Sequence, residues 1–475
     1  VATTVAPSTA RARLRLFPVE GWQADVTATW TDLDNGYDAF AIDNSYRTLS
    51  DRPGRDAQRS LGLALDQRWA LASGAELRSI TTWADSDIVA SFDGDWGNDR
   101  DWGAAGPYDF FSQTLRERRT LSQDLRLASA SEGGLSWVVG AYALRLTEDN
   151  AQDDDGLYLG DVYLRSLDSR YHSTSLALYG DATLPLGGGW SLGAGLRGEQ
   201  RDAHYTDSDG FAFDPRDRMW GGQLSLMREA AGGNAYLTAS RGYKAGGFNI
   251  GAAIPDERLQ FGPEQLLNVE AGYKRHGPIV AVDVAVFWQR RSDQQVATSY
   301  QADPEDPLTF VYYTDNAARG TAHGLEASLR AQLSARWNLD ASLSLMESRY
   351  DGYSYGDRNL DGREWAHAPG YKYSLAFTWR HPAGWMARSD VSGEDAFYFD
   401  TSHDQRSKAR TLVGLRAGYE AARWSVSAWV RNLFDERYAT RGFYFGNEPP
   451  DFPPRLYLRL GDPRQAGVSA EWRFQ

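Results

Sequence analysis

The chain has 475 residues, no cysteine and a formal net charge of −14. The missing cysteines exclude disulfides, a thiol nucleophile and thiolate metal sites. The acidic balance argues against nucleic-acid binding, which needs a basic face. No apolar run approaches the length of about 18 residues that a transmembrane helix requires. Trp and Tyr number 17 and 25, and both favour positions with one apolar and one wet end.

From the N-terminus onward we count nineteen strand-like segments, many of them 11 to 15 residues long. The first members of successive pairs end in short turns at 18–21, 71–74, 131–134, 186–189, 230–233, 276–278, 333–336, 381–384 and 420–423. Between the pairs we expect longer polar loops at about 32–55, 86–115, 148–170, 205–216, 244–263, 290–317, 351–369, 398–406 and 434–463. Short and long connections therefore alternate throughout the chain.

The segments themselves alternate apolar and polar residues with a period of two. In 323–333, leucines and alanines alternate with Glu326, Ser328 and Arg330. This is the period of a β-strand with two unlike faces. A soluble sandwich also shows it, with the apolar face inward. The strand length and the strict alternation of short and long connections favour a transmembrane barrel, which has short periplasmic turns and longer extracellular loops.

Several motifs, in this order, resemble those of the TonB-dependent receptors of Gram-negative outer membranes. They are SRGYKAGGFN (240–249), LNVEAGYK (267–274), YTDNAARGTAHGLEASL (313–329), VRNLFDERYATRGFYF (430–445) and PRQAGVSAEWRF (463–474). The resemblance implies an all-β fold, a transmembrane antiparallel β-barrel of a probable 22 strands of which about 19 are visible. Residues 1–475 then form the receptor barrel, and we expect the N-terminal plug and the first strands to be missing from it. A naturally plugless barrel is the alternative.

The resemblance also implies a function: uptake of a scarce ligand, most often a ferric siderophore, across the outer membrane. The implied partners are outer-membrane lipid, the ligand and TonB, which would act through a plug domain; no catalytic residue, cofactor or metal is assigned. Lumen-lining residues that would contact a plug are Glu270, Lys274, Glu326, Arg330, Arg416, Glu420, Arg431, Glu471 and Arg473. Two other hypotheses remain: a passive outer-membrane pore, and a surface β-protein that binds glycans through its Trp and Tyr residues.

The stretch SRGYKAGGFN at 240–249 raises a separate question, because its glycines and lysine could cradle a phosphate. It lacks the pattern G-x-x-x-x-G-K-[ST], and no helical apolar pattern follows it. We therefore interpret it as a strand that bends into a loop. Tyr243, Lys244, Phe248 and Asn249 become candidate ligand contacts at the strand end.

Loop 434–463 supplies a second group of candidates. Arg441, Phe443 and Tyr444, with Phe445 beside them, could form a cationic and aromatic mouth for an anionic aromatic ligand. The alternative is that these aromatic side chains form a small core within the loop, as long loops often require.

Loop 86–115 supplies the third group. Trp96, Trp102 and Tyr108 could stack on a ligand. Its acidic residues could also bind a divalent cation, although runs of charge like this one are usually a solvated acidic surface: Asp93, Asp95, Asp99 and Asp101.

Two further signals are set aside. DRNLDGRE (357–364) begins like an EF-hand loop, but Ala368 stands where the required glutamate should be. Among the seven histidines no pair has metal-ligand spacing, and only His367 and His403 lie on loops where a haem receptor would place a ligand.

Overall fold

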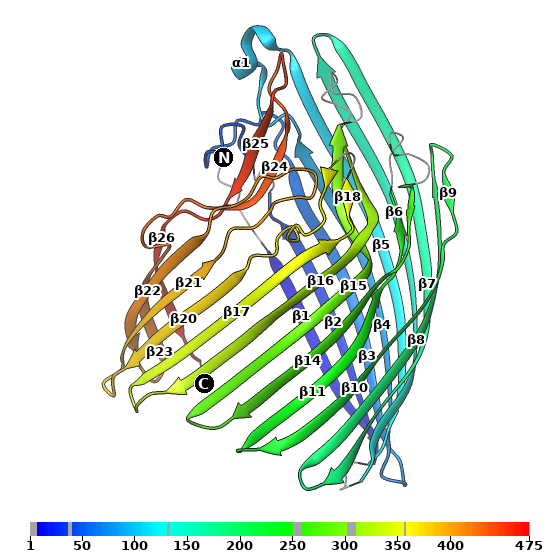
Figure 1. Ribbon diagram of the computed structural model, residues 1–475, viewed down its shortest axis with the longest axis vertical. Coiled ribbons are helices and arrows are strands. Elements are labelled where there is room, and N and C mark those ends of the chain that lie inside the picture. The colour runs from blue at the N-terminus through cyan, green and yellow to red at the C-terminus, as the bar shows by residue number, and fades with distance from the viewer. Residues whose placement is uncertain are drawn as a thin grey trace.

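The computed structural model describes residues 7–36, 40–130, 134–249, 254, 258–301, 310–355 and 358–474. Within these ranges, twenty strands hydrogen-bond into one antiparallel sheet, of which only β9 (Ala212–Phe213) is as short as two residues. The other nineteen strands are the long segments expected from the sequence. The predicted all-β antiparallel barrel is confirmed, and Figure 1 shows its strands wrapped into a tilted wall.

The long strands, in chain order, are β1 (Ser8–Val19), β2 (Trp22–Asp34), β3 (Arg55–Ala70), β4 (Glu76–Asp93), β5 (Tyr108–Ala128), β6 (Ser136–Tyr158), β7 (Asp161–Gly187), β8 (Trp190–Asp207), β10 (Arg216–Ala230), β11 (Gly233–Lys244), β14 (Glu264–His276), β15 (Val280–Gln301), β16 (Phe310–Gln332), β17 (Trp337–Asp351), β20 (Tyr371–Arg380), β21 (Trp385–Glu394), β22 (Arg410–Glu420), β23 (Trp424–Arg431) and β26 (Gln465–Trp472). Each pairs with the next along the chain. No pairing between β1 and β26 occurs in the described ranges, so the sheet has two edges there.

Three small hairpins stand on the long-loop end of the barrel. They are β12 (Gly247–Phe248) with β13 (Gln260–Phe261), β18 (Ser354–Tyr355) with β19 (Arg358–Asn359), and β24 (Ala439–Gly446) with β25 (Pro454–Leu460). The only helical turns described are α1 (Asp99–Trp102) and η1 (Gly103–Ala105). In the described part of the chain, no helix has the length and apolar character needed to cross a membrane.

The strand faces are inverted relative to a water-soluble protein. On β7, Leu176 and Leu178 are 56% and 71% exposed, whereas their neighbours Ser175 and Ala177 are 6% and 5% exposed. Single exposed leucines are common on soluble proteins, but a repeated outward row of them matches the lipid face of a membrane barrel. This pattern opposes the hypothesis of a soluble glycan-binding sandwich, which would turn its leucines inward.

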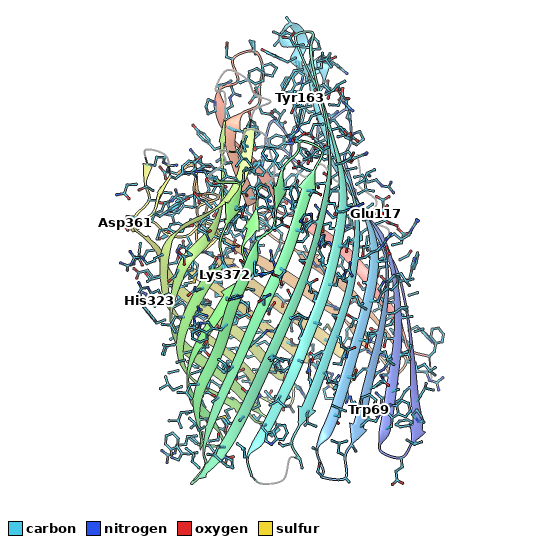
Figure 2. All side chains as sticks on the ribbon, turned by 90° about the vertical axis from the view of Figure 1, so that its right-hand side faces the viewer. Trp69, Glu117, Tyr163, His323, Asp361 and Lys372 are labelled. Atoms are coloured by element: carbon cyan, nitrogen blue, oxygen red, sulfur yellow. The ribbon has the colours of Figure 1, made fainter. Side chains whose placement is uncertain are left out.

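Aromatic side chains gather beside the short turns. Trp22 and Trp69 stack at 6.1 Å between ring centroids, and Figure 2 places Trp69 near the short-turn end of the barrel. Trp385 and Trp472 are 57% and 59% exposed, each next to a short turn or strand terminus. Such a belt is typical of the membrane–water boundary.

Every predicted short turn within the described residues joins two consecutive strands; the turn at 131–134 lies largely outside them. The prediction of a loop at 148–170 is wrong. There β6 and β7 continue as a paired arm to Tyr158 and Asp161, with Leu159 and Gly160 as the turn. The arm carries polar residues on both faces, so it lacks the apolar alternation that marks a strand in sequence. Figure 2 shows Tyr163 on this arm, far from Trp69.

Candidate functional site: the long-loop mouth

Side chains from distant strands meet over the mouth of the barrel. The ring centroid of Phe443, on β24, lies 6.1 Å from that of Tyr312 on β16 and 6.4 Å from that of Trp96, which follows β4. In the sheet, β4 and β16 are separated by all the strands from β5 to β15. Contacts between them therefore require the β24–β25 hairpin to reach over the lumen (Figure 1). We call this group the mouth cluster: Phe40, Trp96, Tyr312, Phe443, Phe445 and Tyr457.

Trp96 is the centre of the mouth cluster. Its ring stacks on Phe40 at 4.9 Å and meets the edges of Phe445 and Tyr457 at 5.6 and 5.2 Å. Tyr457 is 1% exposed and Phe40 8% exposed. Each such aromatic pair contributes about 0.5–1.5 kcal/mol beyond its buried area. The inner rings thus form a loop core, as the alternative interpretation of loop 434–463 anticipated.

The outer end of the same hairpin is cationic. Arg441 and Arg459 are directly opposite each other in the β24–β25 register, and both are exposed. Like charges in this position repel, and no described carboxylate forms an ion pair with either. Arg455, further along the hairpin, is by contrast paired with Glu448 at 2.9 Å. The guanidinium carbon of Arg441 lies 4.8 Å from the centroid of the Phe443 ring. Positive charge therefore lies directly beside the aromatic rings of the mouth cluster.

Tyr444 points to the other face of the hairpin. It is 40% exposed and lies 5.7 Å from the ring of His403. His403 is 8% exposed, and burial lowers the pKa of its imidazole. Its Nδ1 accepts a hydrogen bond from the Gln405 amide. His367 is exposed and packs on Phe397 at 5.1 Å.

Trp102 and Tyr108 form a smaller aromatic group beside the turn of the β24–β25 hairpin, where the ring centroid of Phe452 lies 5.3 Å from that of Tyr108. Tyr108 is 3% exposed, lies 5.9 Å from Trp102, and donates its hydroxyl to Asn447 Oδ1 at 3.0 Å. Asn447 in turn donates to the backbone oxygen of Asp95 at 3.1 Å. Tyr108 is therefore part of the scaffold that positions the loop of Trp96, and its ring is not presented to a ligand.

The residues of 240–249 lie apart from the mouth cluster. β11 ends at Lys244, so the interpretation of this stretch as a strand that bends into a loop holds, and Lys244 is exposed at that end. Tyr243 bonds Glu199 at 2.9 Å, and Phe248 packs on Tyr205 at 4.3 Å. Asn249 is buried, and its amide donates to Thr314 O while its oxygen accepts from Thr314 N, both at 2.7 Å.

Polar side chains line the lumen between the two ends. Tyr236, Glu270, Lys274, Glu326, Lys372 and Arg410 surround a hollow of about 600 Å³. Glu394 pairs there with Arg410 at 2.9 Å and with Lys372 at 3.9 Å; Figure 2 shows Lys372 at mid-height. The other predicted lining residues are in local contacts: Arg330 with Asp340, Arg416 with Ser427, Glu420 with Arg380, Arg431 with Trp429, and Arg473 with Glu471.

Sequence reasoning missed half of the mouth cluster. Phe40, Tyr312 and Tyr457 carried no signal, because their role depends on contacts between segments far apart in the chain. Arg459 could have been found: 439–446 and 454–460 both read as short strands, and pairing them places it opposite Arg441.

Comparison with known proteins gives concordant results. A family model described as "TonB dependent receptor-like, beta-barrel" matches residues 7–433. The pesticin receptor of Yersinia pestis is 25% identical over 286 residues, which cover 58% of this chain and 41% of that relative. The chain thus spans well under half the length of this curated relative in the match.

Solved structures share the fold. The ferric yersiniabactin uptake receptor FyuA from Yersinia pestis superposes with a TM-score of 0.78 at 19% identity, covering 99% of this chain and 71% of that one. The siderophore receptor PiuA from Acinetobacter baumannii gives 0.74 at 15% identity, covering 99% and 75%. The ferric-catecholate import receptor Fiu from K12 E. coli gives 0.71 at 11% identity, covering 100% and 75%.

Proposed function

Because this chain belongs to the TonB-dependent receptor β-barrel family, we propose that it forms the barrel of an outer-membrane receptor that imports a ferric siderophore. The family is one of the Gram-negative outer membrane, and the outward leucine rows and the aromatic belt suit that location. The proposed entry point is the long-loop mouth.

One observation carries the choice of ligand. Arg441 and Arg459, opposite each other in the β24–β25 register, place two exposed arginines at the edge of the mouth cluster, and no described carboxylate forms an ion pair with either. Guanidinium groups bind oxyanions bidentately and stack on planar rings. A ferric catecholate or phenolate chelate offers both negative charge and aromatic faces, so it matches this edge. Tyr312, which is 50% exposed and whose ring centroid lies 6.1 Å from that of Phe443, would flank the chelate.

The names of the relatives point the same way. One solved relative takes up ferric yersiniabactin and another imports ferric catecholates, while the curated relative is a receptor for pesticin. We therefore infer that a ferric siderophore is the primary ligand.

Transport would follow capture. The lumen wall carries alternating charges, including Lys372, Glu394 and Arg410, which can hold a polar plug domain through exchangeable ion pairs. TonB would act on that plug to open a path through the lumen of the barrel. Ion pairs exposed to lumen water are each worth about 0–1 kcal/mol, so a plug held by them can be moved by modest work.

The direct test is binding. Tryptophan fluorescence of the protein purified in detergent would be titrated with a panel of ferric siderophores and with their iron-free forms. We expect a ferric complex to quench in a saturable manner, and the double variant Arg441→Gln/Arg459→Gln to bind at least about tenfold more weakly. Equal binding by the double variant and the native protein would overturn the assignment of the arginine edge.

A further inference from the structure

A second site lies beside the mouth cluster, at the point where β4 ends and its loop begins. Asp93 ends β4, Asp95 follows two residues later, and Asp109 lies on β5 beside them. One carboxylate oxygen from each of the three lies within 4.8 Å of the other two. The close approach of the strands depends on Gly94: a Cβ there would lie 2.3 Å from Phe110 Cδ1. The hairpin register, and not the local sequence, brings the three acids together.

Asp93 is the anomaly of this group. It is 1% exposed, and neither of its carboxyl oxygens has a hydrogen-bond partner among the described residues. Oδ1 of Asp109 is likewise buried and unpartnered. Asp95 differs, because its two oxygens accept the amides of Gly97 at 2.7 Å and Phe110 at 3.0 Å. A buried carboxylate without donors is costly unless a cation or a proton meets it.

The surrounding charges do not neutralise the group. Arg52 reaches Asp109 Oδ2 at 3.0 Å, but it also pairs with Asp155 at 3.0 Å. Asp51 adds a further acid beside them. One guanidinium therefore faces several carboxylates. On Asp109 it binds Oδ2, so Oδ1 stays without a hydrogen-bond partner among the described residues. The uncompensated charge is concentrated at Asp93.

We propose that a calcium ion binds between Asp93, Asp95 and Asp109. Calcium takes oxygen ligands at about 2.3–2.6 Å, so ligands on opposite sides of one ion lie about 5 Å apart, which accommodates the observed spacing. A site made only of oxygen donors disfavours zinc, which prefers nitrogen and sulfur. Magnesium keeps several of its waters, whereas two of the three acids here, Asp93 and Asp95, are 1% exposed. Asp99 and Asp101, suggested by sequence, are exposed on α1 and do not join it.

The ion would stabilise the mouth. Asp95 precedes Trp96, and the backbone oxygen of Asp95 accepts the Asn447 amide from the β24–β25 side. A calcium ion at Asp95 would thus fix Trp96 against the hairpin that carries Phe443 and Arg441. Calcium binding at this site does not require a siderophore. The calcium proposal can therefore be tested separately from the proposed function.

The test is calorimetric titration of the full-length protein with calcium chloride, after purification in detergent and removal of divalent ions with a chelator. The variants are Asp93→Asn and Asp109→Asn, and the matched control is Asp99→Asn, which removes one exposed charge from the same loop. We expect the native protein and the control to bind one calcium at about 10⁻³ M or tighter. Both site variants should bind at least about tenfold more weakly.

Thermal unfolding of the same samples provides a second readout. Calcium should raise the midpoint of the native protein and of Asp99→Asn, and leave Asp93→Asn unchanged. If the native protein neither binds calcium nor gains stability from it, the proposal fails and a proton neutralises Asp93 instead. Loss of binding in Asp99→Asn to the same degree as in Asp93→Asn would also overturn it, since a diffuse acidic surface would then account for binding.

Discussion

Arg441 and Arg459 face each other across the β24–β25 hairpin, two like charges in direct register at the edge of an aromatic cluster. Opposed like charges on a hairpin weaken it. The hairpin keeps them at the point where it crosses the mouth, beside rings that anchor it to β16 and to the loop after β4. A site that must attract an anion is a sufficient physical reason for the arrangement.

Removal of this charge should separate stability from binding. In Arg441→Gln/Arg459→Gln the hairpin loses its repulsion, so we expect equal or slightly higher thermal stability together with weaker binding of a ferric siderophore. A hydrogen bond to a charged group contributes about 1.5–3 kcal/mol, which predicts at least a tenfold loss. The control is Arg47→Gln, an exposed loop arginine outside the mouth cluster. Lower stability of the double variant would show that the pair is structural.

Trp96→Ala should loosen the mouth without unfolding the barrel. The indole contacts Phe40, Phe445 and Tyr457, and truncation of a large buried aromatic costs about 3–5 kcal/mol where it is fully buried. We expect faster hydrogen exchange in 94–107 and 439–460, with unchanged exchange in the barrel strands. Trp96→Phe should restore most of the protection. Uniform loss of protection through the barrel would contradict a local role.

Arg363 should act as a clasp between two loops. Its guanidinium is 8% exposed and donates to the backbone oxygens of Asp400 at 2.6 Å, Thr401 at 3.2 Å and His403 at 2.7 Å. Arg363→Lys replaces the planar guanidinium, whose two terminal nitrogens share these acceptors, with a single compact ammonium. We therefore expect both Arg363→Lys and Arg363→Ala to increase proteolytic cleavage within 395–409. Cleavage at the native rate in both variants would show that the clasp is dispensable.

The charge state of Asp93 should make stability depend on pH when calcium is absent. Burial, and then the negative charge of Asp95, raise the pKa of Asp93; Asp51, Asp109 and Arg52 are the other charged groups beside it. The folded chain then binds the proton more tightly than the unfolded chain, whose Asp pKa is about 3.9. The free energy of unfolding should consequently fall as pH rises from about 4 through neutrality.

Calcium should reverse this dependence, since the ion replaces the proton. We expect the stabilisation by calcium to grow between about pH 5 and about pH 8, measured as the thermal midpoint with calcium chloride against chelator. Asp93→Asn should lose the pH-dependent part of the difference. The same slope in that variant and in the native protein would assign the effect to another group.

The outward faces can be tested with one charge. Leu178→Arg places a cation on the face where leucines are exposed, and such a change costs about 2–4 kcal/mol at mid-membrane depth and less near the interface. Ser328→Arg is the control, because Ser328 lines the lumen hollow. Urea unfolding in lipid vesicles should show a large loss of stability for the first variant only. Equal losses would contradict the assignment of the two faces.

The barrel could be predicted from the sequence because each strand repeats one physical signal, the two-residue period, and each turn repeats another. The two-residue period of apolar and polar residues is lost where a strand extends beyond the lipid. In its outer half β6 carries polar residues on both faces, so the arm reaching Tyr158 and Asp161 was expected as a loop. Within single loops, residue type alone identified Trp96, Arg441 and Phe443, although not which of them meet.

Contacts between loops could not be predicted. Asn44, for example, bonds Leu456 and Leu458 in a segment more than four hundred positions away, and Phe40 joins Trp96 by the same tertiary packing. The acidic group shows the limit most clearly. Proximity in sequence suggested Asp99 and Asp101 as partners of Asp93, whereas the hairpin register supplies Asp109.

The most direct test of the account is uptake of radioactive iron by cells that depend on this protein. The native full-length protein and Arg441→Gln/Arg459→Gln would be expressed at equal levels in the outer membrane, with ferric siderophores as the iron source, in the presence and absence of TonB. We predict saturable uptake that requires TonB and falls at least about tenfold in the arginine variant at limiting ligand. Uptake that is unsaturable, independent of TonB and equal in both proteins would contradict a receptor and favour a passive pore.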